Sequence, residues 1–215
     1  IKLPYDIPYE FFLDKDGKKM SSSAGRGVSA REIADNFPPV ILRLALIGKE
    51  PQVQTSIDPN GELLAILYDW HDKIAEKYWD GVGDDEARLF EILYFGKPPA
   101  KMYYPRFSTV VFVAQMSHLD IEEQFGILKG SPLTSEEKKE LQVRVEYAKK
   151  WLGSYAPGKY KFTLALEKTP EAAKNFSAEQ KDALKQVLAY IEENKSLAGA
   201  DFHAKLHEIK EKLGI

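Results

Sequence analysis

The sequence predicts a mainly α-helical protein with a short β segment at its amino end. Helix-start signatures recur from residue 29 onward, apolar residues repeat at helical spacing after them, and strand character is confined to residues 8–13. The chain has 215 residues, of which 44% are apolar, so it can form a sizeable core. An aromatic content of 12% and a net charge of only −3 exclude a disordered chain.

The amino-terminal segment combines a strand, a tight turn and a loop of small residues. Residues 8–13 are rich in aromatic side chains and extended in character. Asp16-Gly17 follows, and the glycine supplies the positive φ that a tight hairpin turn requires. Ser, Gly and Ala dominate residues 21–27, so the backbone there can approach a ligand closely.

The predicted helices follow one another along the rest of the chain. Several begin with a capping box, in which a Ser or Thr and a Glu or Gln three residues later satisfy the free N–H groups of the first turn. The capping boxes are Ser29…Glu32, Thr134…Glu137 and Ser177…Gln180. A first helix is predicted to start at residue 29. Further helices are predicted over 40–47, where Gly48 ends the helix, and over 62–79, 135–154, 178–195 and about 200–213. The clearest breaks between helices are at 97–100 and 156–158.

The segment 62–79 shows the periodicity best. Its predicted buried stripe consists of Leu63, Leu67, Trp70, Ile74 and Tyr78. Carboxylates lie off the stripe and are interpreted as an ordinary solvated face rather than a catalytic pair; they are Asp69, Asp72 and Glu76.

Charge is distributed unevenly. Residues 61–105 hold five basic and nine acidic residues, whereas residues 138–161 hold seven basic and two acidic ones. Cations beside aromatic faces are typical of single-stranded nucleic-acid binding. The alternative is a solvated helix face over core aromatics, because a buried apolar stripe also runs through this segment. The candidate RNA-binding residues are Arg144, Tyr147, Lys149, Lys150 and Trp151.

Several other features bound the function. The absence of Cys excludes a thiolate zinc site and fits a reducing, cytoplasmic location. His203 and His207 share a helix face, but two imidazoles make no zinc site, so no metal site is predicted. No apolar run approaches the roughly 18 residues of a membrane span, so no membrane partner is expected. The aromatic and basic element 103–107 is open to two interpretations, domain packing or RNA contact.

The most informative segment is Lys19-Met20-Ser21-Ser22-Ser23. A lysine on a loop of small residues can follow a phosphate whose charge grows in a transition state, while hydroxyl and backbone N–H groups donate to its oxygens. The alternative is a surface turn with an incidental lysine, since the Lys-Met-Ser string alone is short.

This segment resembles the K-M-S-K-S signature loop of class I aminoacyl-tRNA synthetases, and its flanks resemble the class I lysyl-tRNA synthetases. Ser22 stands where the signature has its second lysine. The likeness covers most of the chain in order. The stretches that carry it are Pro8–Phe12, Lys19–Gly25, Pro38–Arg43, Ile57–Gly61 and Arg144–Leu152.

The resemblance implies that lysine is activated by ATP to lysyl-adenylate and then transferred to tRNA(Lys). It implies that Lys19 is catalytic, that residues 19–23 bind ATP, and that Mg²⁺ accompanies the nucleotide in the full-length enzyme. None of the four histidines lies in the H-x-G-H pattern that such an active site needs, and only 18 residues precede Lys19. We therefore expect a C-terminal portion that reaches ATP and lysine through an upstream domain, and that by itself holds no cofactor and is inactive.

The resemblance also implies a division into three parts. Residues 1–28 would end the catalytic nucleotide-binding domain, residues 29–105 would form a stem-contact region, and residues 106–215 would form an α-helical cage that binds the anticodon. Two alternatives stay open. One is another class I synthetase such as the glutamyl type, and the other is a free-standing helical module that binds RNA or protein.

Overall fold

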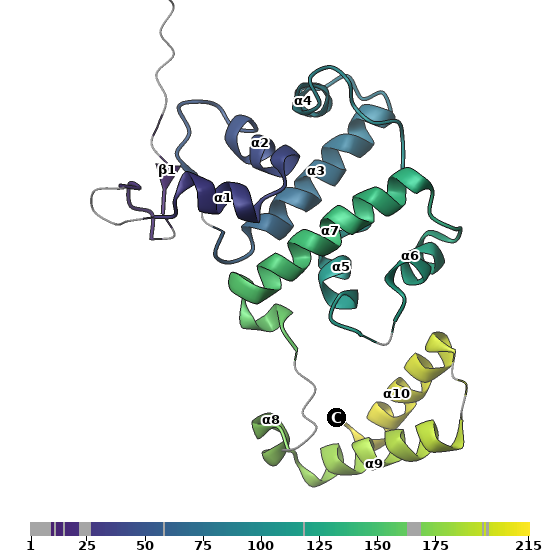
Figure 1. Ribbon diagram of the computed structural model, residues 1–215. Coiled ribbons are helices and arrows are strands. Elements are labelled where there is room, and N and C mark those ends of the chain that lie inside the picture. Colours follow the sequence, from purple (N-terminus) through teal and green to yellow (C-terminus); the bar gives the residue numbers. More distant parts are fainter. Residues whose placement is uncertain are drawn as a thin grey trace, which may run out of the picture. The chain divides into compact units, whose positions relative to one another are not determined.

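A computed structural model describes residues 10, 12–14, 16–21, 27–57, 59–117, 119–162, 169–194, 196 and 198–215 (Figure 1). Within these residues the predicted mainly α-helical fold is confirmed, and the β structure consists of two strands of two residues each and isolated bridges. The chain divides into two compact units, residues 1–162 and 163–215, which are described separately.

The small parallel sheet lies at the start of the first unit. Strand β1 (Phe12–Leu13) pairs with β2 (Thr55–Ser56), with Phe12 opposite Thr55. The turn predicted at Asp16-Gly17 is confirmed, because Gly17 has a φ of 72° and its N–H donates to the Asp14 carbonyl at 3.1 Å. Most of the remaining predicted strand residues lie outside the described part of the chain.

The helices of the first unit confirm most of the sequence-based boundaries. Helix α2 ends at the predicted Gly48, and α7 covers the predicted 135–154. Three further helices, α4, α5 and α6, lie where no boundaries were predicted. The helices are α1 (Ala30–Asn36), α2 (Pro39–Ile47), α3 (Leu63–Trp79), α4 (Asp85–Leu93), α5 (Phe107–Val113), α6 (Ile121–Lys129) and α7 (Ser135–Ser154), followed by a short 3₁₀ turn η1 (Gly158–Tyr160).

One core joins these helices. Helix α3 packs against α2, α4 and α5, and α5 packs in turn against α7. The Tyr68 ring of α3 stacks on the Phe107 ring of α5 with centroids 4.3 Å apart. Elements on both sides of residue 105 therefore share this core, while the functional division at residues 28 and 105 stays a prediction.

The buried face of α3 differs from the predicted stripe. Leu67 and Ile74 are buried as expected, but Leu63, Trp70 and Tyr78 are only half-buried. The fully buried neighbours are instead Leu64, Tyr68 and His71. The reason is that α3 has packing partners on more than one side, which widens and rotates the sector that a single-face pattern predicts.

The predicted capping boxes form at two of three sites. Both halves of the box are present at Thr134 and at Ser177. At Ser29 only the first half forms, with the hydroxyl accepting from the Glu32 N–H at 3.1 Å. The Glu32 carboxylate instead accepts a hydrogen bond from the Tyr155 hydroxyl, which ties α1 to the residue after α7.

The second unit is a small helical element with little core of its own. It contains α8 (Glu171–Lys174), α9 (Ala178–Glu193) and α10 (Gly199–Leu213), and α9 packs against α10. Among the residues described in this unit, only Ile209 is a buried hydrophobic residue. Helix α9 ends two residues before the predicted 195. No helix described in either unit is both long and apolar enough to cross a membrane.

Candidate functional site

The loop that carries Lys19 returns along the edge of β1. Lys19 forms an antiparallel bridge with Leu13, and the Met20 N–H donates to the Phe12 carbonyl at 3.0 Å. The buried Asp14 holds the intervening turn, because its carboxylate accepts the N–H of Lys18 at 2.9 Å. Lys19 therefore projects from a backbone that the strand fixes, and its side chain is exposed.

Met20 closes the base of this loop. Gly27 has a φ of 90°, which favours glycine, and a Cβ added there would lie 2.8 Å from the Cγ of Met20. The Met20 side chain thus packs against the backbone of Gly27, where any larger residue would clash with it. Ser22 and Ser23 lie outside the described residues, and the ATP contacts of Lys19, Met20 and Ser21 stay predictions.

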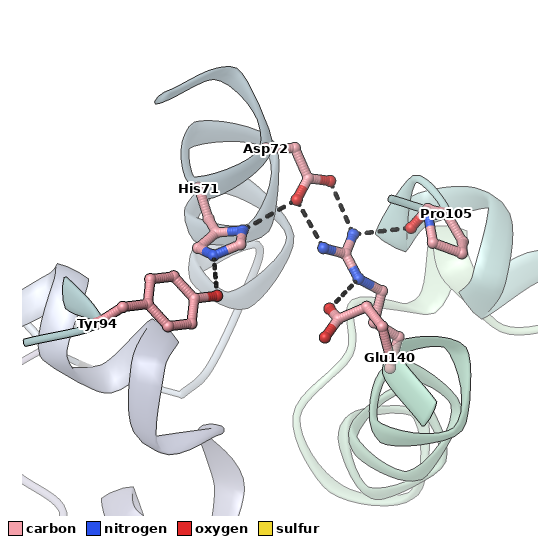
Figure 2. Close-up of polar contacts among 6 residues, drawn as sticks. His71, Asp72, Tyr94, Pro105 and Glu140 are labelled. Carbon is pink, nitrogen blue, oxygen red and sulfur yellow. Dashed lines mark hydrogen bonds and ion pairs between the residues drawn. The ribbon is translucent and has the colours of Figure 1, made fainter. Parts of the chain in front are cut away.

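Arg144 is buried at the centre of a polar network, and Figure 2 labels its partners Asp72, Pro105 and Glu140. Its guanidinium contacts both carboxylate oxygens of Asp72 at 2.6 and 2.7 Å, and it donates to the Pro105 carbonyl at 2.7 Å. Its Nε donates to Glu140, one turn earlier on α7, at 2.7 Å. All three kinds of nitrogen donor are thereby used, as a buried guanidinium requires.

The network continues through α3 to α4. The two ring nitrogens of His71 lie 3.0 Å from the Asp72 carboxylate and 2.9 Å from the Tyr94 hydroxyl. Burial alone would raise the pKa of Asp72, but the hydrogen bonds and charge of Arg144 lower this pKa below its ordinary value. Asp72 is therefore a fixed anion that pairs with a fixed cation. The network joins α3, α4, α7 and the segment before α5.

These contacts correct three sequence-based predictions. Arg144 and Trp151 were predicted to bind RNA, but their exposed fractions are 0% and 2%. The Arg144 guanidinium donates hydrogen bonds to Asp72, Glu140 and the Pro105 carbonyl. The Trp151 indole N–H donates to the Gly61 carbonyl at 3.1 Å. Neither side chain is available at the surface, so these two assignments are wrong. The prediction of a solvated Asp72 is wrong as well.

The other three candidates also lie on α7. Lys149 and Lys150 are exposed, and Tyr147 is half-buried. The Lys150 ammonium pairs with Glu146 at 2.8 Å and lies 4.6 Å from the centre of the Tyr147 ring. RNA binding by these three residues stays a prediction.

Ion pairs reduce the basic character of the segment 138–161. Lys138 pairs with Glu122 at 2.8 Å, and Lys159 pairs with Glu62. Within the described ranges, the cations of this segment without an ion-pair partner are Lys139, Lys149 and Lys161. The excess positive charge that a polyanion would meet is thus smaller than the sequence indicates.

Comparison with known protein families shows which class of protein this chain is similar to. Residues 1–95, which include the Lys19 loop and all elements through α4, match the family model described as tRNA synthetases class I (K).

Particular relatives extend the match over nearly the whole chain. The lysine--tRNA ligase of Archaeoglobus fulgidus is 28% identical over 99% of this chain and 40% of its own length. Lysine--tRNA ligase 1 of Methanosarcina acetivorans is 28% identical over 97% and 39%, and the lysine--tRNA ligase of Pyrococcus horikoshii is 28% identical over 99% and 42%. The resemblance predicted from the sequence is confirmed, and the chain spans about 40% of the length of these curated relatives.

Proposed function

We propose that this chain is the C-terminal part of a class I lysyl-tRNA synthetase, which joins lysine to tRNA(Lys) through lysyl-adenylate at the expense of ATP. The observation that carries the proposal is the match to lysine--tRNA ligases over 97% to 99% of the chain. The relatives are more than twice as long, so an upstream part would supply the lysine pocket and the rest of the ATP site.

In this proposal Lys19 contacts the phosphates of ATP while the adenylate forms. The geometry supports the role, since the ammonium stands on a strand-bound backbone and the exposed side chain can follow a moving phosphate. The Met20 side chain packs against Gly27, which helps to fix the residue that follows Lys19. ATP with its Mg²⁺ would be bound jointly with the upstream part, so the chain alone is inactive.

The helical region would bind tRNA(Lys). Tyr147 and Lys150 support this role because the Lys150 ammonium lies 4.6 Å from the centre of the Tyr147 ring, and Lys149 adds a second exposed cation on the same helix.

The test is lysine-dependent exchange of pyrophosphate into ATP, measured on this chain joined to its upstream part or to the corresponding part of the Archaeoglobus fulgidus relative. We expect Lys19→Ala to reduce exchange by about 10²- to 10³-fold, the loss typical of removing one donor to a developing charge. Lys97→Ala is the matched control, because it removes an exposed lysine from a loop that is distant in sequence.

The outcomes separate the alternatives. Exchange that depends on glutamate and not on lysine would contradict the lysyl assignment in favour of the glutamyl type. Absence of exchange together with tRNA binding that ignores the anticodon and falls steeply with salt would favour the free-standing module.

A further inference from the structure

A hollow of about 520 Å³ lies between α3 and the extended segment 101–106, within the first unit. Helix α3 contributes Asp69, Asp72, Lys73, Glu76 and Trp79 to its lining, and the extended segment contributes residues 101–104 and Arg106. A volume of this size is typical of a site for a small ligand, whereas a protein partner needs a broad surface.

The wall formed by the extended segment is held in place from behind. The Tyr103 N–H donates to Glu137 at 2.9 Å, and the Pro105 carbonyl accepts from Arg144 at 2.7 Å. On the opposite wall, the Trp79 indole N–H donates to the Pro99 carbonyl at 3.0 Å. A ligand would therefore enter a preformed site and would not need to order it, which favours binding.

The lining offers three chemistries side by side. Trp79 and Tyr103 provide aromatic surface, and Trp79 is itself stacked on Tyr104 with ring centroids 5.3 Å apart. The side chains of Lys73 and Glu76 form no ion pair or hydrogen bond in the described part of the chain, so one cation and one carboxylate are available to a ligand, whereas the lining carboxylates of Asp69 and Asp72 pair with Arg106 and Arg144. Arg106 adds a second cation, held loosely by Asp69 at 3.5 Å.

We infer that this hollow holds one unstacked nucleotide of a bound RNA. The base would lie against the aromatic surface and donate an N–H to the Glu76 carboxylate, while Lys73 and Arg106 would meet the backbone phosphates. Lys101 also lines the hollow but pairs with Asp80 at 2.8 Å. Aromatic faces beside cations are the means by which proteins bind splayed bases. The inference rests on the proposed tRNA-binding function, and it adds an RNA-binding site separate from the exposed residues of α7.

It also accounts for the element 103–107, which the sequence left open between packing and RNA contact. Both interpretations apply, to different residues. Phe107 is fully buried and packs against Tyr68, whereas Tyr103 and Arg106 line the hollow.

The sharpest test uses the sign of a charge change. Glu76→Gln removes a negative charge, so electrostatics alone would strengthen the binding of any polyanion. If the Glu76 carboxylate accepts a hydrogen bond from a base, the same change weakens tRNA(Lys) binding, because a neutral amide oxygen is a weaker acceptor than a carboxylate oxygen, and we expect about a fivefold increase in Kd. Glu91→Gln is the matched control, because Glu91 is exposed on α4 and lies outside the hollow.

Two further arms identify the ligand. Polyphosphate has no bases, so Glu76→Gln should leave its binding unchanged or strengthen it slightly. Lys73→Ala should weaken the binding of both tRNA and polyphosphate severalfold, whereas Lys97→Ala should change neither by more than about twofold. Binding of free mononucleotides at this site without binding of tRNA would overturn the RNA assignment.

The outcomes distinguish this inference from the function on which it rests. If the chain binds tRNA(Lys) and Glu76→Gln binds it as well as or better than the original, the inference is overturned and the proposed function stands. If the chain binds no tRNA while the joined protein still exchanges pyrophosphate, the inference is overturned and lysine activation stands. If neither activity is found, both are overturned.

Discussion

The two sides of α7 use the same residue types for opposite purposes. On the inner side, Arg144 is fully buried and pairs with Asp72, which is 72 residues earlier in the chain. On the outer side, Lys149 is exposed, and among the described residues Lys150 pairs only with Glu146 of the same helix. The inner cation holds helices together, and the outer cations are available to a partner.

The difference teaches that counting charges in a segment does not distinguish structural cations from ligand-binding ones. A structural arginine can be identified because its carboxylate partner comes from another element of the fold. A surface lysine that can bind a ligand has no carboxylate partner from another element. The variants below test this contrast.

The largest expected effect is from Arg144→Ala. Removal of the guanidinium leaves the Asp72 carboxylate buried and without its partner, so we expect the free energy of unfolding to fall by about 3–5 kcal/mol. Urea unfolding at pH 7 measures the change. Equal stability of Arg144→Ala and the original chain would contradict the structural role of the inner side, whereas Arg144→Lys should recover only part of the loss.

A second effect of nearly this size concerns Glu137, at the start of α7. Burial alone would raise the pKa of its carboxyl, but hydrogen bonds from Lys129 and from the N–H groups of Thr134 and Tyr103 outweigh burial and hold the pKa at about 2. The ordinary value is 4.5, so the carboxylate stabilises the fold above pH 4.5. This stabilisation, about 3 kcal/mol, is lost as the pH falls from about 5 to about 2.

Urea unfolding at several pH values between 2 and 7 measures this loss. Glu137→Gln should be less stable at neutral pH and should show a shallower decline in acid. A decline as steep as that of the original chain would show that other carboxylates account for it.

A smaller effect is expected from Thr134→Ala, which removes half of the capping box. The Thr134 hydroxyl accepts the Glu137 N–H at 3.3 Å, and loss of such a cap costs about 1 kcal/mol. Ser29→Ala is an informative comparison, because that cap forms only one half of its box. If Thr134→Ala leaves the unfolding free energy unchanged, the cap at the start of α7 does not contribute to the stability of the contacts on its inner side.

The smallest effect on stability is expected on the outer side. Lys149→Ala and Lys150→Ala should each change the unfolding free energy by less than about 0.5 kcal/mol. If the outer side contacts the phosphates of tRNA, each should lower the slope of log Kd against log salt by about one. A destabilisation as large as that of Arg144→Ala would remove the contrast between the two sides.

The sequence predicted best those features that depend on neighbours within four residues. The caps at Thr134 and Ser177, the turn at Gly17 and the end of α2 at Gly48 are all local, and all are confirmed. The Ser29 box fails in part because Tyr155, from far along the chain, takes the Glu32 carboxylate. Local pattern cannot anticipate a distant competitor for the same acceptor.

The same reason explains the outcome at the site. A basic and aromatic segment was evident in the sequence, but only its fold shows that Arg144 meets Asp72 and that Trp151 meets Gly61. The hollow beside Trp79 was not predicted, because its walls come from α3 and from a segment more than 20 residues later. The one signal of this hollow in the sequence was the aromatic and basic element 103–107.

The long reach of α7 also bears on how the protein is made. Its bonds join residues 72, 90 and 123 positions apart, through Arg144 to Asp72, Trp151 to Gly61 and Tyr155 to Glu32. A nascent chain that has emerged only as far as α6 therefore holds Asp72 without its counter-ion and leaves the apolar surface beneath α7 uncovered. Such intermediates are prone to aggregation. The contacts of α7 with α5 and with Asp72 can form only after α7 has left the ribosome.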